Sequence, residues 1–143
     1  MKSYQVNRLI KSEDLNHHGT LFAGRMAEWF VECAFIAAAS LYRKPEGIVC
    51  LKIHGMHFTK PVQKGDIIKL ESKVVRTGNS SMQAYVKAVK NEEPDSYLEG
   101  FITFITVDEQ GNKVLHNVPA QKAETEEERK LAELAGQIVK TRS

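Results

Sequence analysis

The sequence predicts one domain of the α+β class, in which a long apolar helix is wrapped by a curved antiparallel sheet. Two observations support this fold. Residues 21–42 are rich in alanine and hold no helix breaker after Gly24, so we expect one long helix there. Four strand-like runs follow, and the connections between them are too short for parallel crossovers. The length of 143 residues fits a single domain with a substantial core.

A short strand and a polar loop precede the helix. Residues 4–11 alternate loosely, with Tyr4, Val6, Arg8 and Ile10 on one side, as in a half-exposed strand. The next residues, SEDLNHHGT, supply turn formers and a flexible glycine, which is typical of a loop that leads into a helix. Thr20, at the end of this loop, is the expected N-cap of the helix.

The helix is apolar on more than one side. Its main stripe, at helical spacing, consists of Phe22, Met26, Phe30, Cys33, Ala37 and Leu41. Other apolar residues lie outside this stripe, and the only charged residues are Arg25, Glu28 and Glu32. We therefore expect the helix to be enclosed on most sides. It should run to about Tyr42 and stop at Lys44, because the residue before a proline is disfavoured in the α region.

The sheet follows the helix in the sequence. Its expected strands cover residues 48–58, 67–76, 82–90 and 97–107, and the turns that follow them are KPVQKGD, TGNSS, NEEPDS and DEQGN. The last segment, AETEEERKLAELAGQIVK, has Leu131, Leu134 and Ile138 at helical spacing after a glutamate run at 126–128 that suits a solvated helix start. We expect one domain over residues 1–120 and a C-terminal helix or tail over residues 121–143.

One helix cannot cover both faces of such a sheet. The remaining strand edges or faces must be hidden, because exposed apolar strands promote aggregation. The sequence therefore predicts that a second copy of the chain covers them, which makes the protein at least a homodimer.

Composition excludes several classes of protein. Lys and Arg number 20 against 18 Asp and Glu, so no overall charge favours nucleic acid or a membrane surface as a partner. The first residues lack the apolar core of a signal peptide, and no apolar run reaches the roughly 18 residues that span a bilayer. Cys33 and Cys50 lie in apolar runs without a CxxC spacing, which indicates two buried thiols in a reducing compartment. We expect a cytoplasmic protein.

No metal site is expected. His54 and His57 are three positions apart in a strand, so regular alternation points them to opposite faces of the sheet. Neither has a carboxylate or thiol at a matching position, and a metal site needs several such ligands.

Three motifs in consistent order give the chain a family resemblance. NHHGTLFAG precedes the helix, GMHFTKPVQKGD ends the second strand, and RTGNSSM turns from the third strand to the fourth. Over residues 4–107, approximately, the sequence resembles the hotdog-fold acyl-CoA thioesterases. The resemblance implies a helix wrapped by a five-stranded antiparallel sheet, with dimers joined edge to edge and active sites at the dimer interface. Many members of that family assemble further, as hexamers of three dimers.

The resemblance also implies a reaction. Members of that family usually hydrolyse acyl-CoA to a free acid and coenzyme A, with no cofactor apart from the coenzyme A of the substrate. Gly19 and Gly24 would leave room for the thioester beside the amides of the helix start, which would form an oxyanion hole. A second candidate group resembles the turn that contacts coenzyme A and consists of Arg76, Gly78, Ser80 and Ser81. An ordinary hairpin turn has the same local chemistry.

Two loop residues are further candidates for catalysis. His18 can position water or polarise the thioester carbonyl, and Asn16 can orient water. Both residues also suit a loop for structural reasons, because they form local hydrogen bonds or face solvent. The two interpretations stay open.

The catalytic acid of the resembled family falls at Val31, which cannot transfer a proton. Glu32 follows it, and three interpretations compete. In the first, which we adopt, Glu32 is the general base or nucleophile of a thioesterase, helped by desolvation in an apolar helix. In the second, His18 and Glu32 from two subunits form the pair of a hydratase or dehydratase. In the third, Glu32 pairs structurally with Arg25 or across the dimer, and the chain binds acyl-CoA without turnover.

Overall fold

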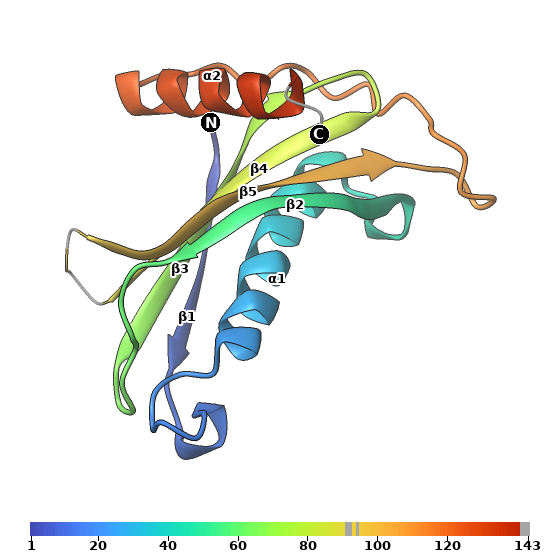
Figure 1. The fold of residues 1–143 in the computed structure, drawn as a ribbon. Coiled ribbons are helices and arrows are strands. Elements are labelled where there is room, and N and C mark those ends of the chain that lie inside the picture. Colours follow the sequence, from blue (N-terminus) through green and yellow to red (C-terminus); the bar gives the residue numbers. More distant parts are fainter. Residues whose placement is uncertain (91–92, 94, 141–143) are drawn as a thin grey trace.

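The structure, a computed structural model, describes residues 1–90, 93 and 95–140. Its strands and helices follow the order β1 (Ser3–Leu9), α1 (Ala23–Tyr42), β2 (Ile48–Phe58), β3 (Ile67–Thr77), β4 (Ser81–Lys90), β5 (Ser96–Thr106) and α2 (Glu126–Lys140). The strands form one antiparallel sheet in the order β1-β3-β4-β5-β2. The sheet curves over α1 and carries α2 on its opposite face (Figure 1), which confirms the predicted α+β architecture. Neither helix is long and apolar enough to cross a membrane, and the described residues form no other that is.

The strands lie where alternation and turn residues predicted them. β2 has the predicted bounds, and each of the other strands begins and ends within two residues of its expected limits. β1 alternates between exposed and half-buried positions, as expected. Of the predicted turn at 91–96, residues 91, 92 and 94 lie outside the described residues, as do residues 141–143 of the C-terminal segment.

The helix α1 begins later than predicted. Its N-cap is Phe22, with φ −64° and ψ 126°, and no side chain caps it. The predicted cap, Thr20, instead accepts a hydrogen bond on its hydroxyl from Asn16 at 3.1 Å, because the loop turns before the helix starts. At the other end α1 stops at Tyr42 as predicted, and Arg43 forms the C-cap in the left-handed region, with φ 64°.

The inner face of the sheet packs against α1. The central residues of the predicted apolar stripe are buried there, namely Met26, Phe30, Cys33 and Ala37. One polar bond joins the two layers, because the buried hydroxyl of Ser72 on β3 donates to the carbonyl of Cys33 at 2.6 Å. The helix is less enclosed than predicted, since the side that bears Val31 and Glu32 is only partly covered in a single chain.

A β-bulge bends β2 where it pairs with β5. The pairing shifts register between Ile53 and Met56, and Gly55 between them has φ 110°. Gly100 on β5 lies directly against this bulge, because a Cβ at Gly100 would overlap the carbonyl oxygen of Gly55. Glycine is therefore required at position 100 by the close approach of two backbones.

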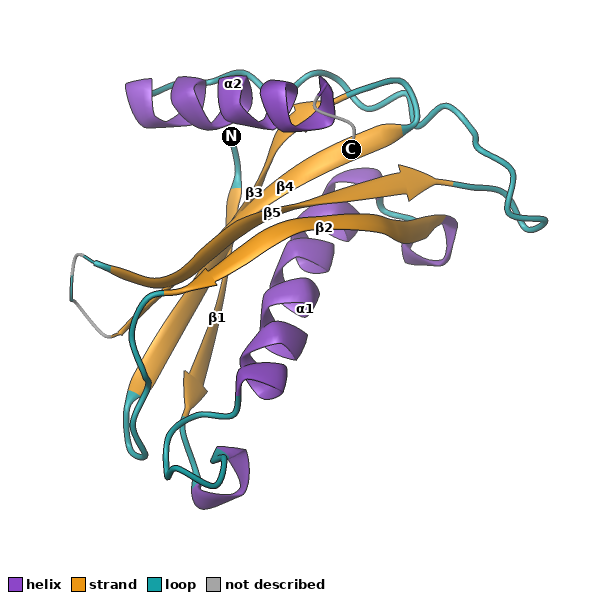
Figure 2. Ribbon diagram, viewed as in Figure 1, coloured by secondary structure: helices purple, strands orange, loops and turns teal. Residues whose placement is uncertain are grey.

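The outer face of the sheet is partly covered by α2 (Figure 2). A second apolar cluster joins them and consists of Val75, Tyr85, Phe101, Leu131 and Ala135. Part of the face that a second subunit was expected to cover is therefore covered by α2 of the same chain. Leu134, predicted on the apolar side of the helix, is 46% exposed, because the packed side of α2 runs through Leu131 and Ala135 instead.

Glu128 in the first turn of α2 is buried, although the glutamate run predicted a solvated helix start. Its carboxylate accepts the amide of Glu124 at 2.9 Å, and it pairs with Lys73 at 3.0 Å and with the amino group of Met1 at 3.4 Å. The hydrogen bond from the Glu124 amide, and then the hydrogen bond and charge of Lys73, outweigh the effect of burial and lower the pKa of Glu128 to about 2. Charge therefore ties α2 to β3 and to the beginning of the chain.

Candidate active site

The loop between β1 and α1 is folded around Asn16. Its side-chain oxygen accepts the amides of His18 at 2.8 Å and Thr20 at 3.2 Å. Gly19 lies in the left-handed region, with φ 81°, where glycine is favoured. The Asn16 side chain is thus engaged within the loop, whereas the rings of His17 and His18 lie 3.9 Å apart and exposed.

Two backbone amides at the start of α1 have no acceptor among the described residues and can bind an oxygen of a ligand. The amides on either side are used, since that of Phe22 donates to the Asp14 carbonyl at 2.9 Å and that of Arg25 to the Phe22 carbonyl at 3.0 Å. The amides of Ala23 and Gly24 donate in none of the backbone hydrogen bonds of the described residues. They lie at the positive end of the helix dipole. This end of the helix can stabilise a carbonyl oxygen that gains negative charge.

An open groove of about 690 Å³ runs along the less covered side of α1. Its walls include Gly24, Val31, Glu32, Phe35, Cys50 and Phe104. A Cβ at Gly24 would lie 2.6 Å from the exposed ring of Phe22, so a larger residue there would displace that ring. The thiol of Cys50 is exposed, so the prediction of two buried thiols is right for Cys33 alone. The groove brings Glu32 and the free amide of Gly24 to one surface.

Glu32 is paired with Arg8 and not with Arg25. The Nη2 of Arg8 donates to Oε1 of Glu32 at 2.9 Å, and the guanidinium lies 5.2 Å from the centre of the Trp29 ring. Arg25 instead pairs with Asp14 at 3.0 Å. The Glu32 side chain is 55% exposed, so the expected desolvation by the helix is absent in a single chain.

Arg8 is a candidate that sequence reasoning missed. The signal was present, because the alternation of the first strand placed Arg8 on the same side as Val6 and Ile10, which faces the helix. Its Nε is buried and donates to no acceptor in the described part of the chain. The guanidinium therefore keeps donor capacity beyond its bond to Glu32.

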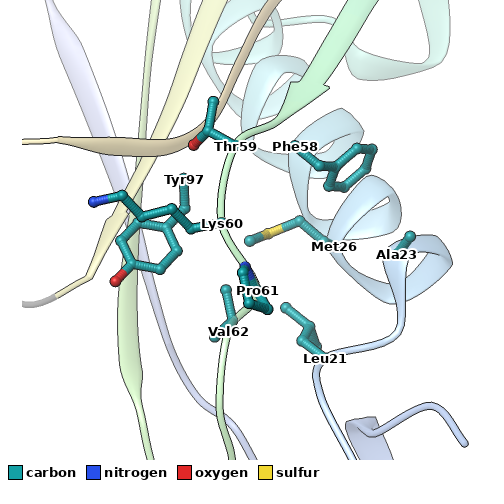
Figure 3. A pocket seen from close by; sticks show the side chains of 9 residues that line it. All are labelled: Leu21, Ala23, Met26, Phe58, Thr59, Lys60, Pro61, Val62 and Tyr97. Carbon is teal, nitrogen blue, oxygen red and sulfur yellow. The ribbon is translucent and has the colours of Figure 1, made fainter. Parts of the chain in front are cut away.

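An apolar cavity of about 240 Å³ lies beside the start of α1 (Figure 3). Its lining comes from α1 and the loop before it, from the end of β2 with the segment that follows it, and from β5. It includes Leu21, Met26, Phe58, Pro61, Val62 and Tyr97. The amino group of Lys60 lies away from α1 in this view, 5.2 Å from the ring of Tyr97. Such a cavity accepts an apolar group of a ligand.

The second candidate group lies at the opposite end of the sheet. Leu9 pairs with Ile67, so the loop after β1 lies beside the start of β3, whereas the turn of Gly78 and Ser80 follows the end of β3 (Figure 1). The structure therefore does not bring the turn next to Asn16 within one chain.

The turn that contains Gly78 and Ser80 is fixed by hydrogen bonds within it and to the end of β5 and the residues that follow it. The amide of Gly78 donates to the carbonyl of Ser81 at 2.9 Å, and the carbonyl of Ser80 accepts the amide of Thr106 at 2.9 Å. Nε2 of His116, a buried residue, lies 3.1 Å from the carbonyl of Ser81. Sequence reasoning did not single out His116, because an isolated histidine outside any motif carries no pattern.

His54 and His57 do not follow regular alternation, because the bulge at Gly55 lies between them. Nε2 of His54 lies 2.6 Å from the hydroxyl of Thr103 on β5, and His57 is exposed. Burial, and then the charge of Lys52, lower the pKa of His54, which favours a neutral ring. Within the described residues, no three His, Cys, Asp or Glu side chains gather as a metal ion requires.

Comparisons with known proteins agree on one family. A sequence model of the thioesterase superfamily matches residues 18–96. The chain is similar to the uncharacterized acyl-CoA thioester hydrolase YkhA of Bacillus subtilis, with 35% identity over 119 residues that cover 80% of this chain and 67% of that protein.

Solved structures share the fold over nearly the whole chain. The acyl-CoA hydrolase of Staphylococcus aureus, solved in complex with butyryl coenzyme A, coenzyme A and coenzyme A disulfide, has a TM-score of 0.86 at 28% identity and covers 96% of this chain and 82% of its own. An apo-hexameric acyl-CoA thioesterase has a TM-score of 0.87 at 31% identity, over 96% of this chain and 88% of its own. Further structures of the S. aureus protein carry alanine in place of an aspartate, a threonine or an asparagine.

Proposed function

Because the chain belongs to the thioesterase superfamily, we propose that it is an acyl-CoA thioester hydrolase. The observation that carries the proposal is the start of α1, where the backbone amides of Ala23 and Gly24 are unused and Gly24 borders the same groove as Glu32. Relatives named as acyl-CoA hydrolases support this choice of substrate class.

In the proposed reaction the thioester carbonyl lies against the amides of Ala23 and Gly24. Glu32 takes a proton from water, the water oxygen bonds to the carbonyl carbon, and the amides stabilise the oxyanion that forms. The C–S bond then breaks, and the proton on Glu32 passes to the sulfur of coenzyme A. Direct attack by Glu32 through a mixed anhydride, which water then hydrolyses, uses the same groups.

The apolar cavity beside Leu21 and Met26 is the proposed site of the acyl chain. It lies next to Ala23, whose amide is one of the proposed oxyanion donors. An apolar cavity of roughly 150 Å³ holds a benzene molecule. A cavity of about 240 Å³ therefore suffices for a short acyl chain.

One acidic residue of the S. aureus hydrolase has an apolar counterpart here by spacing. The replaced asparagine and aspartate of that protein have the same separation along the chain as Asn16 and Val31. Val31 has no proton to transfer. Glu32 is therefore the proposed base, Asn16 holds the loop, and His18 positions water.

The proposed site is shared between two copies of the chain. β2 is an edge strand, and its side chains Val49, Leu51 and Ile53 are 42%, 59% and 39% exposed. Such an edge pairs readily with another strand. Pairing of two β2 edges would carry the turn of one copy, with Arg76 and Gly78, toward the loop of the other. The hexameric relative supports further assembly, and two free thiols suit a cytoplasmic location.

The test is hydrolysis of a panel of acyl-CoA thioesters, measured as release of free thiol. We expect Glu32→Gln to lower kcat by about 100-fold or more, and Glu28→Gln, a neighbouring acid of the same groove, to keep the wild-type rate. A wild type inactive on every acyl-CoA would overturn the hydrolase. Full activity of Glu32→Gln would remove Glu32 from the mechanism, and hydration of crotonyl-CoA by the wild type would reveal a hydratase.

A second function, binding of acyl-CoA without turnover, is favoured by Val31 and by the ion pair of Glu32 with Arg8. This function predicts that wild type and Glu32→Gln bind coenzyme A with equal affinity and that neither releases thiol. Calorimetric titration beside the thiol assay separates the two functions.

A further inference from the structure

A row of polar side chains crosses the outer face of the sheet. In the strand register Arg76 on β3 stands opposite Gln83 on β4, and Gln83 stands opposite Thr103 on β5. Nη1 of Arg76 donates to Oε1 of Gln83 at 3.1 Å, and Nε2 of Gln83 donates to the hydroxyl of Thr103 at 3.3 Å. Nε2 of His54, on β2, lies 2.6 Å from the same hydroxyl. Four neighbouring strands thus contribute one residue each.

The row is buried and has a fixed direction. Gln83 is 1% exposed and Thr103 is 5% exposed, so leaving either without a partner is costly. Arginine can only donate, which forces the oxygen of the Gln83 amide toward Arg76 and its nitrogen toward Thr103. The hydroxyl proton of Thr103 is then available to a neutral ring nitrogen of His54. Each side chain is oriented by the next.

Among the described residues, the guanidinium of Arg76 at the end of the row has no carboxylate partner. None of the salt bridges in the described part of the chain includes Arg76. α2 passes close to it, because a Cβ at Gly136 would lie 3.6 Å from Nε of Arg76. Arg76 also lies near the end of β3, two residues before Gly78 of the turn. An oriented guanidinium that pairs with no carboxylate of the described residues, close in sequence to a turn of small residues, suits a phosphate group.

We infer that Gln83 and Thr103 are positioning residues that hold the guanidinium of Arg76 toward a phosphate of bound coenzyme A. The inference rests on the proposed function, which supplies a ligand that carries phosphates. A row that merely stiffened the sheet would change stability alone. A positioning row changes the binding of phosphate-bearing ligands and leaves the reacting end of the substrate untouched.

The experiment compares two thioesters with the same acyl group, one of coenzyme A and one of pantetheine, which lacks the nucleotide. We expect Arg76→Gln to raise KM for the acyl-CoA by about tenfold. Thr103→Val, which keeps the shape and removes the hydroxyl, should raise it about threefold to tenfold. Thr103→Ser restores the hydroxyl and should match the wild type. KM for the pantetheine thioester and kcat for both substrates should not change.

Calorimetric titration with coenzyme A repeats the comparison without turnover. If the wild type binds coenzyme A but hydrolyses no thioester, the proposed hydrolase function is contradicted. Weaker binding of coenzyme A by Thr103→Val would still support the positioning role of Gln83 and Thr103. If Thr103→Val binds coenzyme A as tightly as the wild type, or raises KM for both substrates alike, the positioning role of Gln83 and Thr103 is contradicted. The proposed hydrolase function is then unaffected. A wild-type protein that does not bind coenzyme A would contradict both the hydrolase function and the positioning role. Should circular dichroism show Thr103→Val unfolded, Gln83→Met is judged by the same criteria.

Discussion

The two faces of the sheet are closed by different kinds of contact. The inner face meets α1 through a large apolar cluster that includes Phe30 and Phe104, with the bond between Ser72 and Cys33 as its polar link. The outer face meets α2 through a smaller apolar cluster and the buried charge of Glu128, and it carries the polar row beside them. Apolar packing on the inner face should dominate stability, whereas the outer face should respond to pH and ligands.

The largest expected effect on stability comes from disrupting the apolar packing of the inner face. Phe30 is fully buried, so Phe30→Ala should lower the free energy of unfolding by about 3–5 kcal/mol. Urea denaturation at a fixed protein concentration measures this loss. Phe101→Ala removes the same ring from the outer cluster, where the side chain keeps 9% exposure, and should cost less. A greater loss of unfolding free energy for Phe101→Ala than for Phe30→Ala would show that the outer face contributes more to stability than the inner face.

An intermediate effect is expected at the charged contact of α2. Glu128→Gln leaves Lys73 and the amino group of Met1 without their carboxylate, and should lower the free energy of unfolding by about 1–3 kcal/mol at pH 7. Glu127→Gln is the matched control, because its side chain is 64% exposed and its ion pair with Lys87 is long, at 3.9 Å. The control should change stability by less than about 0.5 kcal/mol.

The same contact predicts a pH dependence. The folded state lowers the pKa of Glu128 from 4.5 to about 2, so this carboxylate stabilises the fold fully above its unfolded pKa. The stabilisation is lost as pH falls from about 4.5 toward 2. The difference in unfolding free energy between wild type and Glu128→Gln should therefore shrink over that range. A difference that stays constant down to pH 2 would contradict the assignment.

The smallest expected effect on stability is at the open groove. Arg8→Gln removes a partly exposed ion pair with Glu32 and should cost under about 1 kcal/mol in unfolding free energy. If Arg8 positions the base, kcat should fall about threefold to tenfold. Thiol release and urea denaturation measure the two effects, with Arg25→Gln as the matched arginine. Unchanged kcat in Arg8→Gln beside an inactive Glu32→Gln would show that Glu32 needs no positioning by Arg8.

The backbone could be predicted from local patterns. Alternation and turn residues set the strands, and Pro45 together with an alanine-rich run set the end of α1, because these signals act over a few residues. The start of α1 was misplaced, since Asn16 and not the helix uses the hydroxyl of Thr20. The loop and groove residues could also be named from the sequence, although their roles remain predictions.

Side-chain partners could not be predicted, because they depend on register between distant strands. Glu128 belonged to a glutamate run that suits solvent, and only the packing of α2 places Lys73 and the chain start beside it. The link from Arg76 to Gln83 and Thr103 likewise exists only once three strands are aligned. The exposure of Cys50 follows from the edge position of β2, which a run of apolar letters does not reveal.

The two glycines at the bulge have a consequence for how this protein can vary. Gly100 admits the backbone of Gly55, and a Cβ at position 100 would also approach the ring of Phe30 to 3.0 Å. A side chain at 100 would therefore push in two directions at once, outward on the bulge and inward on the helix. The curvature of the sheet and the packing of α1 against it therefore both depend on the absence of a side chain at position 100. A substitution at Gly100 is therefore expected to disturb the sheet and the packing of α1 together, whatever the residues of the groove or the turn.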